Sequence, residues 1–296
     1  MECTLVCDHH GVVRARDVLA EDDADTWTFV RKKKRSKRSK RAPPRAVRSG
    51  PAAAAASRAA AADAEEEESE DALAARVRER CEQLGASKLY AWLRQSAAAA
   101  LGDGTDVVDI VVYGVGRFIE TDAALQQLAC ALRLRRDVAA AGRVELFEPL
   151  LSNVEQRAAR ALGFELIARN ELGWRPIGSR RTLFFMPHCP KWLYHNVLAS
   201  NWSRESLRRV IIVGNSFTVY AQHDLVWDDD AEGVCAATIE RACTALVERA
   251  QPRWKSGDES AAESRLRTAF SDASVHSFAF DETFALEPVP KLYVPP

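Results

Sequence analysis

The chain has 296 residues, is 47% hydrophobic and carries a formal net charge of −1 at pH 7. It can therefore bury a core, and no apolar run reaches the length that crosses a bilayer, which argues against a membrane protein. The 7 cysteines are scattered without a CxxC pair, which argues against a disulfide scaffold and against a structural zinc site. The first residues, MECTLVCDHHGVV, lack the pattern of a secretory signal. We expect a cytoplasmic protein, with the nucleus as a second location.

Residues 1–72 are predicted to be disordered, with a basic segment followed by an Ala/Glu-rich segment. The basic run Arg31–Arg41 reads RKKKRSKRSKR and has three interpretations: a nuclear localisation signal, a weak contact to nucleic acid, or a solvated linker. Phosphates on Ser36 and Ser39 would offset its charge, but the sequence does not show whether they are added.

Residues 73–296 are predicted to form one α/β domain, because strand and helix patterns alternate. Two helices come first, with apolar faces at Leu73, Val77 and Leu84 and at Leu89, Trp92 and Leu93. The predicted strands are 107–113, 144–147, 165–168, 182–186, 210–213 and 275–280. The helices between them begin near 121, 152 and 190, and a later one carries Cys235, Ile239, Ala242 and Leu246.

This alternation favours a doubly wound, mostly parallel Rossmann-like sheet flanked by helices. We expect strand 107–113 at its centre, with 182–186 beside it. Ligands of such sheets bind beyond the carboxyl ends of the strands, where the strand order reverses. Three turns are expected at that edge.

The first turn is Gly114-Val115-Gly116, followed by Arg117. Two glycines let the backbone come close to a phosphate or sugar, although the third glycine of the dinucleotide pattern is replaced by Ile119. Glu148 closes the next strand and has the chemistry to bind ribose hydroxyls. The turn predicts either a nucleotide-like ligand or a tight strand–helix connection without one.

The second turn is Pro187-His188-Cys189-Pro190. His188 and Cys189 have the chemistry of a nucleophile and base, and a thiolate before a proline can bind haem iron. Adjacent side chains seldom converge on one atom, so a buried thiol with a backbone-bonded histidine is the alternative. Apart from haem iron at Cys189, we expect no metal site.

The third turn contains Asn215 and Ser216 after strand 210–213. Residues of these types cap the following helix, and they also hydrogen-bond ligands. Both interpretations stay open at this point.

Four segments resemble the SRR1-like domain, the sensitivity-to-red-light-reduced family of eukaryotes, in its mammalian-type form. They are YGVGRF (113–118), LGFELIARNELG (162–173), TLFFMPHCPKWLYHNVLASNW (182–202) and VIIVGNSF (210–217). The resemblance implies roles in circadian rhythm and light signalling in plants, and in haem biosynthesis and clock-gene expression in animals. It implies no catalytic residues.

We therefore expect a regulatory protein of haem biosynthesis and circadian rhythm with a site at the sheet edge for haem or a nucleotide-like cofactor. The site residues expected are Gly114, Gly116, Arg117, Glu148, His188, Cys189, Asn215 and Ser216. One alternative is a methyltransferase-like or other nucleotide-dependent enzyme, which we regard as less favoured. The other is a ligand-free scaffold that binds protein partners, which the sequence does not identify.

Overall fold

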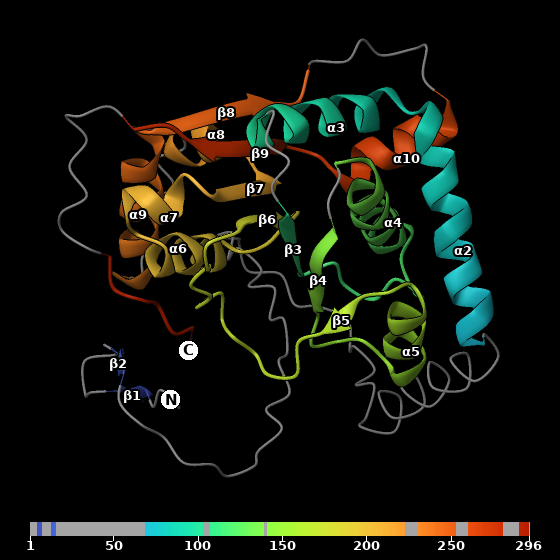
Figure 1. Cartoon of the computed structure of the whole chain (residues 1–296), viewed down its shortest axis with the longest axis horizontal. Coiled ribbons are helices and arrows are strands. Elements are labelled where there is room, and N and C mark those ends of the chain that lie inside the picture. The colour runs from blue at the N-terminus through green and yellow to red at the C-terminus, as the bar shows by residue number, and fades with distance from the viewer. Residues whose placement is uncertain are drawn as a thin grey trace, which may run out of the picture. The chain divides into compact units, whose positions relative to one another are not determined.

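The computed structural model describes residues 5–7, 13–15, 69–102, 107–138, 141–222, 230–252, 260–280 and 290–295 (Figure 1). Two short strands, β1 (Leu5–Cys7) and β2 (Val13–Ala15), pair with each other, and the sequence pattern does not predict them. The basic run Arg31–Arg41, Ser36 and Ser39 lie outside the described residues. The disorder, localisation and nucleic-acid contact expected of that region remain predictions.

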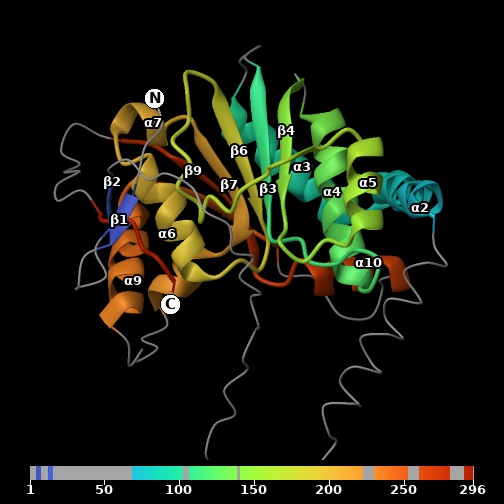
Figure 2. The ribbon, with the colours of Figure 1, turned by 90° about the horizontal axis from the view of Figure 1, so that it is seen from below.

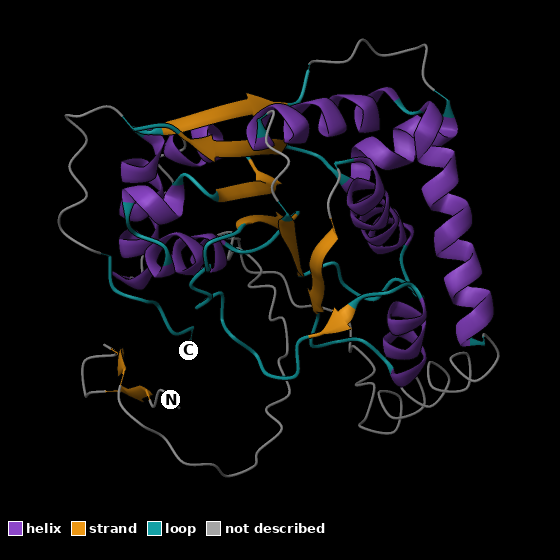
Figure 3. Cartoon of the chain, viewed as in Figure 1, coloured by secondary structure: helices purple, strands orange, loops and turns teal. Residues whose placement is uncertain are grey.

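The rest of the described chain alternates between helices and strands (Figure 3). The helices are α2 (Glu70–Gln83), the 3-10 turn η1 (Leu84–Ala86), α3 (Lys88–Leu101), α4 (Asp122–Asp137), α5 (Asn153–Ala161), α6 (Lys191–Ser200), α7 (Arg204–Leu207), α8 (Phe217–Gln222), α9 (Asp230–Cys243) and α10 (Ala261–Ala269). The strands are β3 (Val108–Tyr113), β4 (Ala141–Phe147), β5 (Glu165–Leu166), β6 (Arg181–Met186), β7 (Val210–Asn215), β8 (Leu246–Ala250) and β9 (Ala273–Phe278).

These strands form a 7-stranded sheet in the order β5-β4-β3-β6-β7-β9-β8. The pairs among β5, β4, β3, β6 and β7 are parallel, whereas β9 is antiparallel to both β7 and β8. The chain adds β4 and β5 on one side of β3 and then returns to add β6 on the other. The predicted doubly wound sheet is confirmed, with the strand order reversing between β3 and β6.

Helices cover both faces of the sheet, as Figure 2 shows, with α6 and α9 on one side and α2, α4 and α5 on the other. Alternate residues of each strand serve the two layers. Ile110 and Val112 pack with the α2, α4 and α5 layer, whereas Val111 and Tyr113 pack with α6 and α9. The inner strands are buried on both faces, which explains their nearly continuous apolar sequences.

Polar side chains start several helices where the sequence places them. Thr121 caps α4 by accepting the Ala124 N–H, and Ser152 and Glu155 form a capping box at α5, near the predicted helix start at 152. The first helix begins at Glu70, three residues before the expected start, because Ser69 caps it. Among the described residues, we find no helix with the length and hydropathy needed to cross a membrane.

The connection from β5 to β6 contains no helix within the continuous described stretch 141–222; residues 167–180 cross the sheet as a loop, teal in Figure 3. The loop lies over β3 and β4, because Glu171 accepts a hydrogen bond from the Tyr113 hydroxyl at 2.8 Å and Arg175 pairs with Glu145. One part of the sheet is therefore covered by a loop rather than by a helix.

Some local predictions were wrong. Leu246 belongs to β8 and not to the preceding helix, because the Thr244 hydroxyl binds the Arg241 carbonyl in the turn that ends α9. The strand expected at 165–168 is only two residues long, and the last strand ends at Phe278.

Candidate functional site

The glycine turn after β3 is closed by Glu148, the acidic residue after β4. Gly114 and Gly116 have φ of 70° and 76°, a left-handed conformation that favours glycine. The Gly116 N–H donates to Oε2 of Glu148 at 2.9 Å, and the Leu150 N–H donates to Oε1 at 3.0 Å. Burial raises the pKa of Glu148, and these two N–H groups partly offset that effect. The sequence therefore correctly places Gly114, Gly116 and Glu148 together, but the carboxylate binds the turn itself.

Cys189 joins the second turn to the first. Its side chain is buried, and Sγ donates to the Tyr113 carbonyl at 3.5 Å. A Cβ at Gly114 would lie 2.7 Å from this sulfur, so glycine is required for the close approach. Burial strongly raises the pKa of Cys189, which keeps the thiol protonated and disfavours the thiolate that haem ligation needs.

His188 makes different contacts from Cys189. Its φ is 58°, its backbone N–H donates to Oδ1 of Asn215 at 2.8 Å, and its ring Nε2 lies 3.1 Å from the Ala269 carbonyl. The ring and the Cys189 sulfur therefore bond to separate carbonyls. These contacts are those of the alternative interpretation, a buried thiol next to a histidine that is bonded to the backbone.

The third turn is linked to the second by a buried tyrosine. The Tyr194 hydroxyl on α6 donates to the Met186 carbonyl and accepts the Asn215 N–H at 3.0 Å. A Cβ at Gly214 would lie 2.6 Å from the Tyr194 ring, so this contact also depends on glycine. Tyr194 was not among the predicted site residues, although it belongs to the TLFFMPHCPKWLYHN segment.

Ser216 caps a helix, which is one of the two roles open from the sequence. Its Oγ accepts the Val219 N–H at 3.1 Å at the start of α8. The Asn215 side chain instead connects His188 with the Tyr220 hydroxyl, to which its Nδ2 donates at 2.6 Å. Asn215 therefore belongs to the same group of contacts as the second turn, whereas Ser216 contributes at the start of α8.

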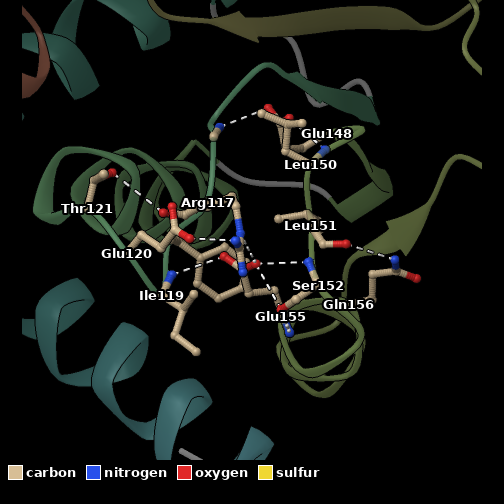
Figure 4. Close-up of polar contacts among 12 residues, drawn as sticks. Arg117, Ile119, Glu120, Thr121, Glu148, Leu150, Leu151, Ser152, Glu155 and Gln156 are labelled. Atoms are coloured by element: carbon tan, nitrogen blue, oxygen red, sulfur yellow. Dashed lines mark hydrogen bonds and ion pairs between the residues drawn. The ribbon is translucent and has the colours of Figure 1, made fainter. Parts of the chain in front are cut away.

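Arg117, which follows the glycine turn, is held by the carboxylates of Glu120 and Glu155 (Figure 4). Its Nε lies 3.4 Å from Oε2 of Glu155, and its Nη1 pairs with Glu120. Glu155 is fully buried and accepts the Ile119 N–H at 3.0 Å and the Ser152 N–H at 2.9 Å. Glu155 thus ties the loop after β3 to the loop after β4, a role that its capping-box position only partly indicated.

The arrangement offers a ligand two kinds of group at the point where the strand order reverses. Gly114 is exposed although the Cys189 sulfur lies against it, Gly116 is half-buried, and the Glu148 carboxylate retains acceptor positions beyond its two backbone contacts. The described residues contain no group of three His, Cys, Asp or Glu side chains arranged to hold a metal ion. The groups that the site presents are polar hydrogen-bonding groups.

Comparison with known proteins identifies related sequences. A model described as the SRR1 domain matches residues 86–277. The chain is 36% identical to an SRR1-like protein of Mus musculus over 137 residues, which cover 46% of this chain and 55% of that protein. It is 32% identical to the protein Sensitivity to Red Light Reduced 1 of Arabidopsis thaliana over 180 residues, 60% of this chain and 61% of that one.

An SRR1-like protein of Drosophila melanogaster is 32% identical over 120 residues, 40% of this chain and 43% of the relative. The matched regions thus span between 43% and 61% of the length of these relatives. No solved structure matches the chain. Residues 86–277, which the SRR1 domain model matches, include all three turns of the candidate site.

Proposed function

Because the chain belongs to the SRR1 domain family, we propose that it is a regulatory protein of haem biosynthesis and of clock-gene expression that acts through a small-ligand site at the carboxyl edge of its sheet. A link to light and clock signalling is supported by the Arabidopsis relative, which is named for reduced sensitivity to red light. One observation supports the site: Gly114, Gly116, Glu148 and Cys189 meet where the strand order reverses.

The ligand that this geometry supports best is nucleoside-like. An acidic side chain at the end of the strand next to the glycine turn suits ribose hydroxyls, and glycines suit a close backbone approach. Haem bound through Cys189 is supported less well, because the thiol is buried, protonated and already bonded to the Tyr113 carbonyl. A haem-linked role would then be exerted through regulation rather than through iron ligation at this cysteine.

A second candidate function is a methyltransferase-like activity. Counted along the main sheet, the strand order is 3-2-1-4-5-7-6, and the seventh strand, β9, is antiparallel. This order is shared with enzymes that use S-adenosylmethionine, whose nucleoside lies at the end of the first two strands. The likeness is one of fold and does not identify a substrate.

The test is thermal unfolding of the full chain with S-adenosylhomocysteine, ATP, NAD and haemin. A ligand at about 100 times its dissociation constant adds about 2.7 kcal/mol of stability. We expect S-adenosylhomocysteine or another nucleoside ligand to raise the unfolding midpoint by several degrees. We expect any shift of the midpoint that haemin causes to be the same in Cys189→Ala as in the wild type.

The variants Gly116→Asp and Gly116→Ala form a matched pair for this test. Both force a side chain into the same left-handed backbone, but only the aspartate places a second carboxylate beside Glu148. We expect Gly116→Asp to abolish the ligand shift and Gly116→Ala to weaken it less. If none of the ligands shifts the wild-type midpoint, the proposal fails and the scaffold interpretation replaces it.

A further inference from the structure

A cavity of about 410 Å³ lies away from the glycine turn, under the loop that connects β5 and β6. Its charged lining comprises Asp109, Arg143, Glu145, Arg175 and Arg180. Asp109 and its register partner Thr182 lie near the amino-terminal ends of β3 and β6, opposite to the edge that carries the three turns. The volume is that of a small-molecule site.

The floor of this cavity is an unusual face for inner strands. Asp109 and Val111 lie on one face of β3, and Arg143 and Glu145 lie on one face of β4, because alternate residues point the same way. Val111 is the register partner of Glu145. Charged side chains on inner strands need partners or solvent, so this part of the sheet is not built for a helix to cover.

The loop that covers the cavity is held in place by two buried asparagines. Asn196 belongs to α6, and Asn201 directly follows it. Asn201 accepts the Ile177 N–H at 2.8 Å and donates to the Arg175 carbonyl at 2.9 Å. Asn196 donates to the Leu172 carbonyl at 2.8 Å. Both amides are at most 2% exposed, so the loop is fixed by bonds shielded from water. The cavity is therefore preorganised, which is what a binding site requires.

Its carboxylates are already bonded, whereas two of its guanidiniums face solvent. Glu145 pairs with Arg175, and Oδ1 of Asp109 accepts the Arg143 backbone N–H at 2.8 Å and lies 3.4 Å from Arg180. The Arg180 side chain is 55% exposed. The exposed Arg143 side chain has no ion pair within the described part of the chain. The remaining binding capacity is cationic.

We propose that this cavity binds a small ligand through a phosphate group held between Arg143 and Arg180. Guanidinium groups match phosphate oxygens with paired hydrogen bonds. The carboxylates keep the two arginine-bearing segments in position, since Asp109 bonds to the backbone of one and the side chain of the other. The site is separate from the carboxyl edge, so it does not depend on the function proposed above.

The test is calorimetric titration of the full chain with inorganic pyrophosphate at constant ionic strength. We expect saturable binding to the wild type, weakened by at least about tenfold in Arg143→Gln and in Arg180→Gln. Arg143→Gln keeps the backbone bond to Asp109, so its fold should be retained, as its unfolding midpoint will show. Arg160→Gln, an exposed arginine on α5, is the matched control and should bind like the wild type.

The proposal is overturned if pyrophosphate does not bind saturably, or if all four proteins bind it equally. It is also overturned if sulfate at the same concentration competes with equal affinity, because that result indicates an unselective surface charge. Gly116→Asp should leave pyrophosphate binding unchanged. Each of the two proposed sites can therefore be refuted without affecting the other.

Discussion

The contact between Gly114 and Cys189 allows a sharp test of how the site is packed. Replacing Gly114 with alanine places a Cβ 2.7 Å from the cysteine sulfur, in a backbone with φ of 70°. Gly116→Ala is the matched control, because its φ is 76° and the nearest atom to its Cβ, in Ala124, is 3.8 Å away. The two variants share the backbone penalty and differ in the steric one.

A left-handed conformation costs a non-glycine residue about 1–2 kcal/mol, and this cost applies to both variants. Overpacking of a buried contact costs about 1–3 kcal/mol more and applies only at position 114. We therefore expect the free energy of unfolding to fall by about 1–2 kcal/mol in Gly116→Ala and by about 2–5 kcal/mol in Gly114→Ala.

Urea unfolding followed by circular dichroism measures both changes. Adding Cys189→Ala to Gly114→Ala should recover most of the steric part, since the sulfur is removed, giving a coupling energy of about 1–3 kcal/mol. Equal losses in the two glycine variants, or a coupling near zero, would refute a tight contact between Gly114 and the Cys189 sulfur.

Three further predictions concern side chains that support the turns. Glu155→Gln should lower the free energy of unfolding by about 1.5–3 kcal/mol in chemical denaturation, because the buried carboxylate binds Arg117 and two backbone N–H groups. If Glu155→Gln lowers the free energy of unfolding no more than the exposed Glu79→Gln does, this prediction is wrong. Tyr194→Phe should cost about 1–3 kcal/mol in the same assay, because it leaves the Met186 carbonyl and the Asn215 N–H without the hydroxyl. An unchanged midpoint would show that the hydroxyl does not link β6 to β7. Burial alone would raise the pKa of Glu248, but the His276 ring 3.6 Å away, the Thr218 hydroxyl that donates to the carboxylate, and the nearby Ser216 and Ser274 hydroxyls outweigh it and hold that pKa well below its usual 4.5. Its stabilising contribution is therefore present above about pH 4.5 and lost as the pH falls toward the folded-state pKa, so Glu248→Gln should flatten the acid limb of a stability–pH curve. An equally steep limb in the variant would count against this assignment.

The sheet was predictable because its inner strands are short, apolar and bounded by turn residues. VVDIVVY and VIIV read clearly as buried strands, and the strand–helix alternation restricts the order to a doubly wound sheet. β8 was missed because LVERA is short and polar at an edge, and α10 was missed because Leu266 is the single large apolar side chain in AAESRLRTA. Leu246 was misplaced because its spacing from Ala242 fits a helix equally well.

The candidate site was predictable as a location but not as a set of contacts. Gly114, Glu148 and Cys189 each follow a parallel strand, so they lie at one edge of the sheet regardless of their side-chain contacts. Which partner each side chain takes depends on distances that spacing does not encode. The bond from Gly116 to Glu148, the burial of Glu155 and the hydroxyl bridge of Tyr194 could be found only in three dimensions.

The proposed regulation runs through the glycine turn at the carboxyl edge of the sheet. The most direct measurement is rescue of clock-gene rhythm in cells that lack the protein, using wild type, Gly116→Ala and Gly116→Asp at matched abundance. We predict rescue by the wild type, at least partial rescue by the alanine variant and none by the aspartate variant. Full rescue by a folded Gly116→Asp protein would contradict a role for this turn.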